Sequence, residues 1–261
     1  MKTREEARRY AITYLLEERE EDPIPIPEDE AAQRVLLRSL INERRPLHVT
    51  SEFRHAQNIE LLAQRAERGD VDWTESLPTA DRRLHIWQGD ITRLKVDAIV
   101  NAANAQLLGC FIPMHRCIDN AIHSAAGVDL RLACAELMSE QRHPEPTGRA
   151  KITPGFNLPA RYVLHTVGPI IRTQTPSPLE REQLASCYYS CLRLAAEHGL
   201  EQVAFCCIST GEFHFPNALA AEIAVKTVCE YLDNDPLCSV RHVIFNVFKD
   251  EDLALYRALL C

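Results

Sequence analysis

Residues 101–127, NAANAQLLGCFIPMHRCIDNAIHSAAG, constrain this chain more than any other stretch. An apolar run ends here in small residues and two asparagines, and the stretch closes in a segment where Ile118, Ile122 and Ala125 share one helical face. The segment between, with Pro113 near the predicted first turn, is expected to be a loop that enters a helix N-terminus. Backbone N–H groups at such a terminus attract anions and lower the pKa of nearby thiols. The sequence therefore predicts a strand–loop–helix unit with an anion site.

The loop in this stretch carries a candidate metal site. Cys110, His115 and Cys117 lie within eight residues, and sulfur and imidazole ligands suit zinc. Three protein ligands leave the fourth position of a tetrahedral zinc open, as in catalytic sites. The other interpretation is two core cysteines and an unrelated histidine, because this spacing is uncommon in structural zinc sites. A zinc deaminase is disfavoured, since its HxE and PCxxC patterns are absent from the sequence.

Composition narrows the class of protein. The chain has 261 residues, of which 46% are hydrophobic, enough for one large domain or for one domain with an appendage. The net charge of −8 argues against broad nucleic-acid binding, which needs a basic surface. The N-terminus MKTREEARRY lacks the apolar core of a signal peptide, and no apolar run approaches the roughly 20 residues of a membrane span. The ten cysteines lie mostly in apolar runs, so we expect reduced thiols in a cytoplasmic protein with no membrane partner.

The pattern of the chain changes at Arg83. Three helices are predicted before it, at 5–20, 31–44 and 53–68, and none of them carries a pattern for chemistry. Strands then alternate with helices, which predicts an α/β sheet covered by helices on both faces. Strands are predicted at 84–87, 97–101, 151–153, 162–167, 202–208 and 242–247, and helices at 114–126, 129–142, 178–197, 217–233 and 251–260.

Four segments of the second part carry a family resemblance. They are GDIT at 89–92, the stretch from NAAN to IDNAIHSAAG, ISTGEFHFP at 208–216 and FNVFKD at 245–250. In order and spacing they resemble the macrodomain, the ADP-ribose-binding fold, across roughly residues 84–260. The resemblance implies a three-layer α/β/α macrodomain with a mixed central sheet at residues 76–261, and residues 1–75 are expected to form a helical N-terminal extension packed on it.

Two positions depart from the ordinary macrodomain pattern. GCFIPMHRC stands where that family carries a glycine run, and His214 stands where a second glycine of its phosphate loop is usual. Together with the helical extension, these departures resemble the zinc-containing macrodomains, which are ADP-ribosyl hydrolases often associated with class M sirtuins. The resemblance implies a zinc cofactor and removal of mono-ADP-ribose from protein side chains. A non-catalytic ADP-ribose reader and a hydrolase of a small metabolite such as O-acetyl-ADP-ribose are the alternatives.

The resemblance also assigns roles to individual side chains. It puts Asp119 in the place of the catalytic aspartate, Asn104 at the distal ribose, and Asp90 with the Ile91 N–H at the adenine. From the residues alone, a carboxylate in a first helical turn pairs with the helix dipole, an asparagine after a strand forms a turn, and Asp90 caps a turn. His123 follows Asp119 by four residues. Its alternative roles are a partner that supports Asp119, a substitute metal ligand, or a hydrogen-bonded buried histidine, and we favour the last.

The remaining ligand contacts are expected from two further loops. The ISTGEF stretch follows a predicted strand, and Gly211 would let its backbone N–H groups approach a diphosphate, although an ordinary strand-to-helix loop reads the same way. Phe248 is expected beside the adenine. The predicted ligand-binding set is Asp90, Ile91, Asn101, Asn104, Ser209, Thr210, Gly211, Glu212, Phe213, Asn246 and Phe248, the catalytic set is Asp119 and Asn104, and the metal set is Cys110, His115 and Cys117.

Overall fold

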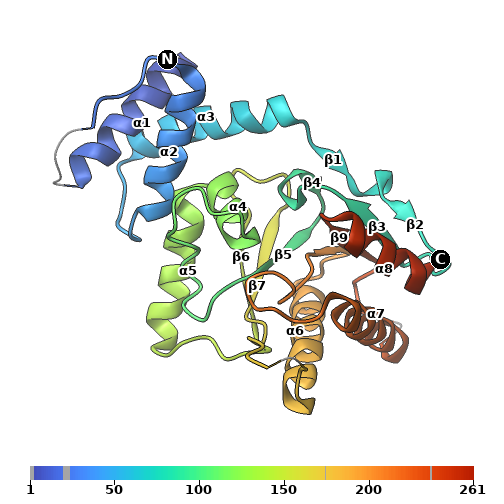
Figure 1. The fold of residues 1–261 in the computed structure, drawn as a ribbon. Helices are drawn as coiled ribbons and strands as arrows, with labels where there is room; N and C mark the ends of the chain where they lie inside the picture. Colours follow the sequence, from blue (N-terminus) through green and yellow to red (C-terminus); the bar gives the residue numbers. More distant parts are fainter. Residues whose placement is uncertain (1–2, 20–23, 174, 236) are drawn as a thin grey trace.

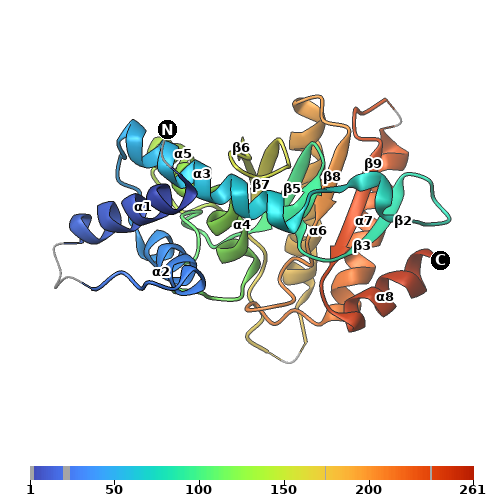
Figure 2. The same ribbon diagram turned by 90° about the horizontal axis from the view of Figure 1, so that it is seen from above.

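A mixed β-sheet forms the centre of the molecule (Figure 2). The structure is a computed structural model that describes residues 3–19, 24–173, 175–235 and 237–261. Within these residues seven strands pair in the order β2-β3-β9-β8-β5-β7-β6. The strands are β2 (Leu77–Pro78), β3 (Leu84–Gln88), β5 (Ala98–Ala102), β6 (Ala150–Pro154), β7 (Tyr162–Thr166), β8 (Gln202–Phe205) and β9 (His242–Val247).

The five inner strands run parallel, and the two edge strands β2 and β6 are antiparallel to their neighbours. The inner strands are apolar along their length because helices cover both faces of the sheet, and the first four residues of β5 are all buried. Parallel strands end at the same edge of a sheet, so the loops after β3, β9, β8 and β5 open on one side of the molecule. The mixed sheet expected from the sequence is confirmed.

Helices form two layers around this sheet (Figure 1). Helix α4 (Ile118–Ala126) packs against α5 (Val128–Gln141) and β5, whereas α6 (Pro178–Glu197), α7 (Asn217–Asn234) and α8 (Asp250–Leu260) pack against one another on the other side of the sheet. The predicted helices after residue 128 therefore all form, with boundaries shifted by no more than one residue.

The first part of the chain folds into three helices, α1 (Arg4–Glu18), α2 (Glu30–Glu43) and α3 (Ser51–Arg68). Each begins after a side chain that accepts a backbone N–H of the first turn, and these N-caps are Thr3, Asp29 and Thr50. Position 20, the predicted end of the first helix, lies outside the described residues.

These three helices pack against the rest of the molecule beside α4. They bury an apolar cluster that includes Leu37 and Phe53 and that reaches Val128 of α5. Both α2 and α3 also contact α4 directly. The three-helix unit (Figure 1, upper left) therefore lies next to the stretch from which the sequence analysis started.

Several local predictions were wrong. The helix expected at 114–126 begins only at Ile118, because Cys117 takes the N-cap position and Met114 has a left-handed φ of 56° that no α-helix accommodates. Pro113 therefore does not stand in the first helical turn. The strand expected at 202–208 ends at Phe205. Three two-residue strands were missed, since they are too short to show alternation: β1 (Val71–Asp72), β2 and β4 (Leu94–Lys95).

Candidate active site

The predicted site residues gather along the edge where the parallel strands end. Asp90 follows β3, Asn101 ends β5, Ser209 lies beyond β8 and Phe248 follows β9. In the sheet order these four strands are consecutive neighbours, so their carboxyl ends form one continuous rim. Loops at such a rim are the usual place of ligand binding in α/β proteins. The topology thus brings together segments that are far apart in the sequence.

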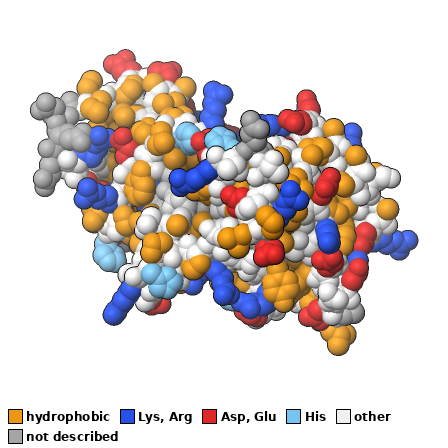
Figure 3. Space-filling model, turned by 60° about the horizontal axis from the view of Figure 1, so that its bottom comes forward, with side chains coloured by type: hydrophobic (Ala, Val, Ile, Leu, Met, Phe, Trp, Pro, Cys, Tyr) orange, Lys and Arg blue, Asp and Glu red, His pale blue; other side chains and the backbone are white. Residues whose placement is uncertain are grey.

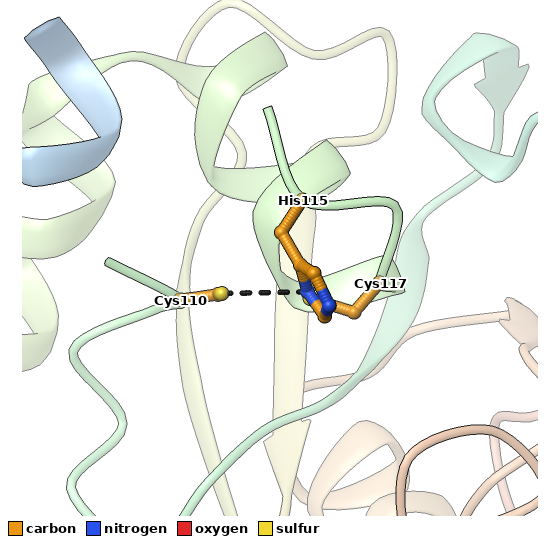
Figure 4. A group of neighbouring side chains, drawn as sticks. All are labelled: Cys110, His115 and Cys117. Carbon is orange, nitrogen blue, oxygen red and sulfur yellow. Dashed lines mark hydrogen bonds between the residues drawn. The ribbon is translucent and has the colours of Figure 1, made fainter. Parts of the chain in front are cut away.

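The metal loop, residues 105–117, brings its three predicted ligands to one point (Figure 4). The donor atoms of Cys110, His115 and Cys117 all lie within 4.8 Å of one another, and Cys110 Sγ is 3.6 Å from His115 Nδ1. Bonds of about 2.3 Å to sulfur and about 2.05 Å to nitrogen at a tetrahedral angle would separate two zinc ligands by about 3.6 Å. The separation of Cys110 Sγ and His115 Nδ1 therefore fits two ligands of a tetrahedral zinc, and the third donor, Cys117, lies within 4.8 Å of both.

The second ring nitrogen of His115 faces the loop that follows β8. His115 Nε2 lies 3.7 Å from Glu212 Oε1, while Nδ1 faces Cys110. A metal-bound histidine commonly presents its other nitrogen to a carboxylate, which fixes the orientation of the ring. Glu212, predicted as a ligand contact, therefore lies where it would support the metal loop.

The thiol of Cys117 differs from expectation. Its sulfur accepts the Asn120 N–H at 3.4 Å, so it does stand at the N-terminus of α4. Burial nevertheless raises the pKa of this thiol to about 12, and the opposing effect of the Asn120 N–H is smaller. The helix N-terminus therefore does lower the pKa of this thiol, as expected, but burial raises it by more.

Asp119 points into the protein beneath the metal loop. Its Oδ1 accepts the side-chain N–H of Asn101 at 2.8 Å, and its Oδ2 accepts that of Asn104 at 3.4 Å. Asn104 also donates to the Gly109 carbonyl at 3.1 Å. Burial raises the pKa of Asp119 to about 6, with the hydrogen bond from Asn101 acting in the other direction. The predicted catalytic pair is thus in contact, with Asp119 as the buried partner.

A second Cys/His group, which sequence reasoning missed, lies behind Asp119. The donor atoms of His123, Cys134 and His165 are within 4.8 Å of one another, and all three residues are buried. His165 Nε2 lies 2.9 Å from Thr153 Oγ1, and its Nδ1 lies 3.2 Å from Asn101 Nδ2. The only sequence signal was the placement of these residues in apolar helices and strands.

His123 does not have the hydrogen bonds expected of it. Neither ring nitrogen has a hydrogen-bond partner among the described residues, although Nε2 lies 3.5 Å from Asp119 Oδ1. Burial lowers the pKa of His123 well below its usual value, so the ring is neutral. A Cβ at Gly109 would approach the His123 ring to 2.8 Å, and Gly109 has a φ of 79°. The histidine therefore serves as a packing surface for the start of the metal loop.

The phosphate loop, residues 208–216, is more tightly constrained than predicted. Ser209 and His214 have left-handed φ values of 64° and 56°. The left-handed φ at His214 accounts for the glycine that is usual at this position in the family. The Ser209 hydroxyl is buried against Gly168, so Ser209 presents its backbone to the rim. A Cβ at Gly211 would meet nothing within 4 Å, which leaves the space beside its backbone open for a ligand. Phe213 is half-buried.

The predicted adenine end contains an unexpected arginine. Asp90 accepts the Thr92 N–H at 3.0 Å, and its other oxygen accepts Arg68 Nη1 of α3 at 3.2 Å. Phe248 is 75% exposed, as an aromatic platform for a base needs to be. Asn246 is buried and donates its side-chain N–H to the Gly89 carbonyl at 2.9 Å, so it holds the loop after β3. Arg68, from the part of the chain in which no site chemistry was expected, is therefore in contact with a predicted site residue.

Comparison with known proteins decides the family. The Macro domain family matches residues 100–224. A protein-ADP-ribose hydrolase of Treponema medium is 50% identical over 262 residues, covering 99% of each chain. The chain belongs to the macro domain family. A protein-ADP-ribose hydrolase of Staphylococcus aureus is also 50% identical, over 85% of this chain and 82% of its own. The sequence-based expectation of a hydrolase acting on ADP-ribosylated protein agrees with these names.

Solved macrodomain structures confirm the fold. A Trypanosoma brucei macrodomain in complex with ADP-ribose is similar with a TM-score of 0.66 and 28% identity, covering 89% of this chain and 96% of that one. An Oceanobacillus iheyensis macrodomain with ADP has a TM-score of 0.61 and 38% identity, covering 70% and 92%. The macrodomain fold with a mixed sheet and flanking helices, expected from the sequence, is therefore established.

Proposed function

We propose that this macrodomain is a zinc-dependent hydrolase that removes mono-ADP-ribose from modified protein side chains. The observation that carries the proposal is the group of Cys110, His115 and Cys117, which fits three ligands of a tetrahedral metal at the rim of the sheet. The names of the relatives support the activity, and the donor spacing supports the metal.

The rim offers a path for ADP-ribose from the end of β3 to the metal loop. Adenine would lie at Asp90 and the Ile91 N–H, with Phe248 against its face. The diphosphate would lie between the backbone of residues 209–213 and the N-terminus of α4, both of which present N–H groups. The distal ribose would then reach Asn104, with Asn101 supporting Asp119 beneath it.

The reaction is the hydrolysis of a glycosidic bond at the anomeric carbon of the distal ribose. When bound by Cys110, His115 and Cys117, zinc supplies a Lewis acid that polarises oxygen ligands. Asn104 orients the ribose, and Asp119 fixes Asn104 through the 3.4 Å hydrogen bond. We assign Asp119 as the group that takes the proton of the attacking water, while the bond to the protein side chain breaks with oxocarbenium character at carbon.

Other features of the molecule bear on its partners. Acidic, basic and apolar side chains are interspersed on the face shown in Figure 3, unlike the basic face that binds nucleic acid. Among the described residues, no helix is both long and apolar enough to cross a membrane. A class M sirtuin system is part of the proposal on the basis of the resemblance to zinc-containing macrodomains alone. A cytoplasmic location is part of it on the basis of the cysteine distribution and the charged N-terminal sequence.

The proposal is tested with a mono-ADP-ribosylated protein as substrate. The purified enzyme should release ADP-ribose, chelation should stop the release, and added zinc should restore it. An ADP-ribose reader would bind the substrate without releasing anything. A metabolite hydrolase would instead act on O-acetyl-ADP-ribose and leave the modified protein intact. Full release by the chelated enzyme would remove zinc from the mechanism.

A further inference from the structure

The C-terminal end of α2 contacts the metal loop through a buried asparagine. Asn42 has no exposed surface. Its Oδ1 accepts the Met114 N–H at 3.1 Å, and its Nδ2 donates to Ser124 Oγ of α4 at 2.8 Å. One side chain from the N-terminal helices therefore joins the middle of the metal loop to the helix that follows it.

A second link runs through Arg38, one turn earlier on α2. Arg38 Nη2 donates to Asn120 Oδ1 at 2.9 Å, and Asn120 Nδ2 donates to the Ile112 carbonyl at 3.0 Å. The His115 N–H also donates to the Ile112 carbonyl, at 3.2 Å. Ile112 and Met114 are thus each fixed from the side of α2, and the backbone of the metal ligand His115 is bonded to this fixed segment.

A third link fixes the start of the metal loop. Arg131 of α5 is buried, and its Nε donates to the Leu108 carbonyl at 2.6 Å. Its Nη1 donates to the carbonyls of Ile41 and Asn42 at the end of α2, at 3.0 and 2.9 Å. The guanidinium carbon also lies 4.3 Å from the centre of the Phe111 ring. The metal loop is therefore held before, within and after its ligands by groups around the end of α2.

The conformation of Met114 shows why the loop needs this support. A methionine with a φ of 56° is strained, and such a residue persists only where its surroundings over-determine it. The Asn42 acceptor fixes the N–H of this strained residue. If Met114 relaxes to an ordinary φ, the next residue, His115, turns its imidazole away from Cys110 and Cys117.

We propose that Asn42 is a positioning residue for the metal loop, so that the N-terminal helices complete the reaction centre without supplying a ligand. Asn42 accepts the Met114 N–H, and by fixing Met114 it keeps His115 Nδ1 close to the sulfur atoms of Cys110 and Cys117. The inference rests on the proposed function, because it takes the loop to bind zinc. It explains why a chain with this loop also carries α2 against it.

The test compares two side chains at the ends of one hydrogen bond. Asn42→Leu introduces a larger, branched apolar side chain and removes both hydrogen bonds of Asn42. Ser124→Ala removes the bond from Asn42 to α4 and the bonds from Ser124 Oγ to Asn120, but it leaves the bond between Asn42 and the Met114 N–H in place. Metal affinity is measured by competition between the protein and a chromophoric chelator for zinc, and the Co²⁺-substituted protein reports thiolate ligation by its absorption. We expect Asn42→Leu to weaken zinc binding by about 10–100-fold and Ser124→Ala by less than about 3-fold.

A rescue variant and the other constants separate positioning from general stability. Asn42→Asp keeps an acceptor for the Met114 N–H and should restore zinc affinity to within about 5-fold of the wild type. ADP-ribose affinity should change by less than about 3-fold in Asn42→Leu, since Asp90 and Phe248 are not touched, while kcat at limiting zinc falls.

The zinc affinities of these variants decide whether Asn42 positions the metal loop. Wild-type zinc affinity in a folded Asn42→Leu would overturn the positioning role, and so would an Asn42→Asp variant as weak as Asn42→Leu. If Asn42→Leu does not fold, the comparison of Asn42→Asp with Ser124→Ala decides: equal and large losses of zinc affinity in both contradict the proposal. A wild-type protein that binds no zinc would instead overturn the proposed function itself.

Discussion

The part of the chain that the structure describes contains two groups of one kind, each with cysteine and histidine donors within 4.8 Å, and they differ in setting. Cys110, His115 and Cys117 are half-buried in a loop at the rim of the sheet. His123, Cys134 and His165 are buried in the layer between α4, α5 and β7. The first group came from eight neighbouring residues, whereas the second is assembled from three elements of the fold.

The two groups have the same kinds of donor atoms but different surroundings, so donor composition alone does not define a functional metal site. In the buried group, His165 already has Asn101 and Thr153 as hydrogen-bond partners, so a metal ion would have to break these bonds. In the rim group, the sulfur of Cys110 and the nitrogen of His115 face each other at a zinc-like spacing beside open space at Gly211. We therefore assign chemistry to the rim group and packing to the buried group.

The strongest test changes one cysteine in each group. Cys117→Ala should lose zinc and lower hydrolysis by more than about 100-fold, because a ligand is removed. Cys134→Ala should keep zinc and hydrolysis but lose about 1–3 kcal/mol of stability to the cavity. Zinc content, turnover and urea unfolding of both variants check this. Comparable activity in the two variants would remove the distinction between the groups.

Asp119 lies between the two groups, and a substitution there tests whether it acts in the reaction or only in packing. Asp119→Ala should lower turnover by about 100-fold and change ADP-ribose affinity by less than about 3-fold, if it acts in the chemical step with Asn104. Single-turnover kinetics and calorimetry separate the two effects. Equal losses in turnover and affinity would mean that Asp119 only supports the loop, as the buried group does.

The predicted adenine site at Asp90 lies outside both Cys/His groups. Asp90→Ala should weaken ADP-ribose binding by roughly 1–3 kcal/mol, since a buried adenine amino group loses its acceptor. Turnover at saturating substrate should change little. Glu230→Ala on the surface of α7 removes the same charge away from the rim and serves as the control. Calorimetric affinity equal to that of the control would exclude Asp90 from the ligand site.

The buried group should affect stability rather than activity, through a pH dependence of the free energy of unfolding. Burial lowers the pKa of His165 to about 3, whereas the unfolded side chain titrates near 6.5, at about the reference value. The stability from this neutral histidine is therefore complete above about pH 6.5 and is lost as the pH falls towards 3, by about 1.4 kcal/mol per pH unit. Asp119, whose pKa is raised, acts in the opposite direction between about pH 6 and 4.

A variant isolates this contribution. His165→Gln should show a slope of unfolding free energy against pH that is shallower than that of the wild type by about 1.4 kcal/mol per pH unit between pH 6 and 4. Asp119 and the neutral His123 are present in both proteins, so their effects cancel in the difference when the substitution leaves their pKa values unchanged. Urea unfolding across this range measures the two slopes, and identical slopes would show that His165 is not held neutral by burial.

Local patterns carried the predictions that succeeded. The alternation of strands and helices depends on residues close in sequence, so periodicity reveals it. Cys110, His115 and Cys117 are also close in sequence and do come together in the structure, but zinc binding by them stays a prediction. Contacts between Asn42 and Met114, and between Arg68 and Asp90, depend on how α2 and α3 dock, which no local pattern encodes. The late start of α4 was missed for a related reason, because the strained Met114 is stabilised by that docking. The division into an extension of residues 1–75 and a macrodomain of 76–261 stays a prediction.

The zinc content of the purified native protein, measured together with its rate of ADP-ribose release, tests the central claim most directly. We expect about one zinc per chain in the wild type and in Cys134→Ala and almost none in Cys117→Ala, with the rate of hydrolysis following the zinc content. A native protein that carries no zinc, yet releases ADP-ribose from a modified protein at its full rate, would contradict it.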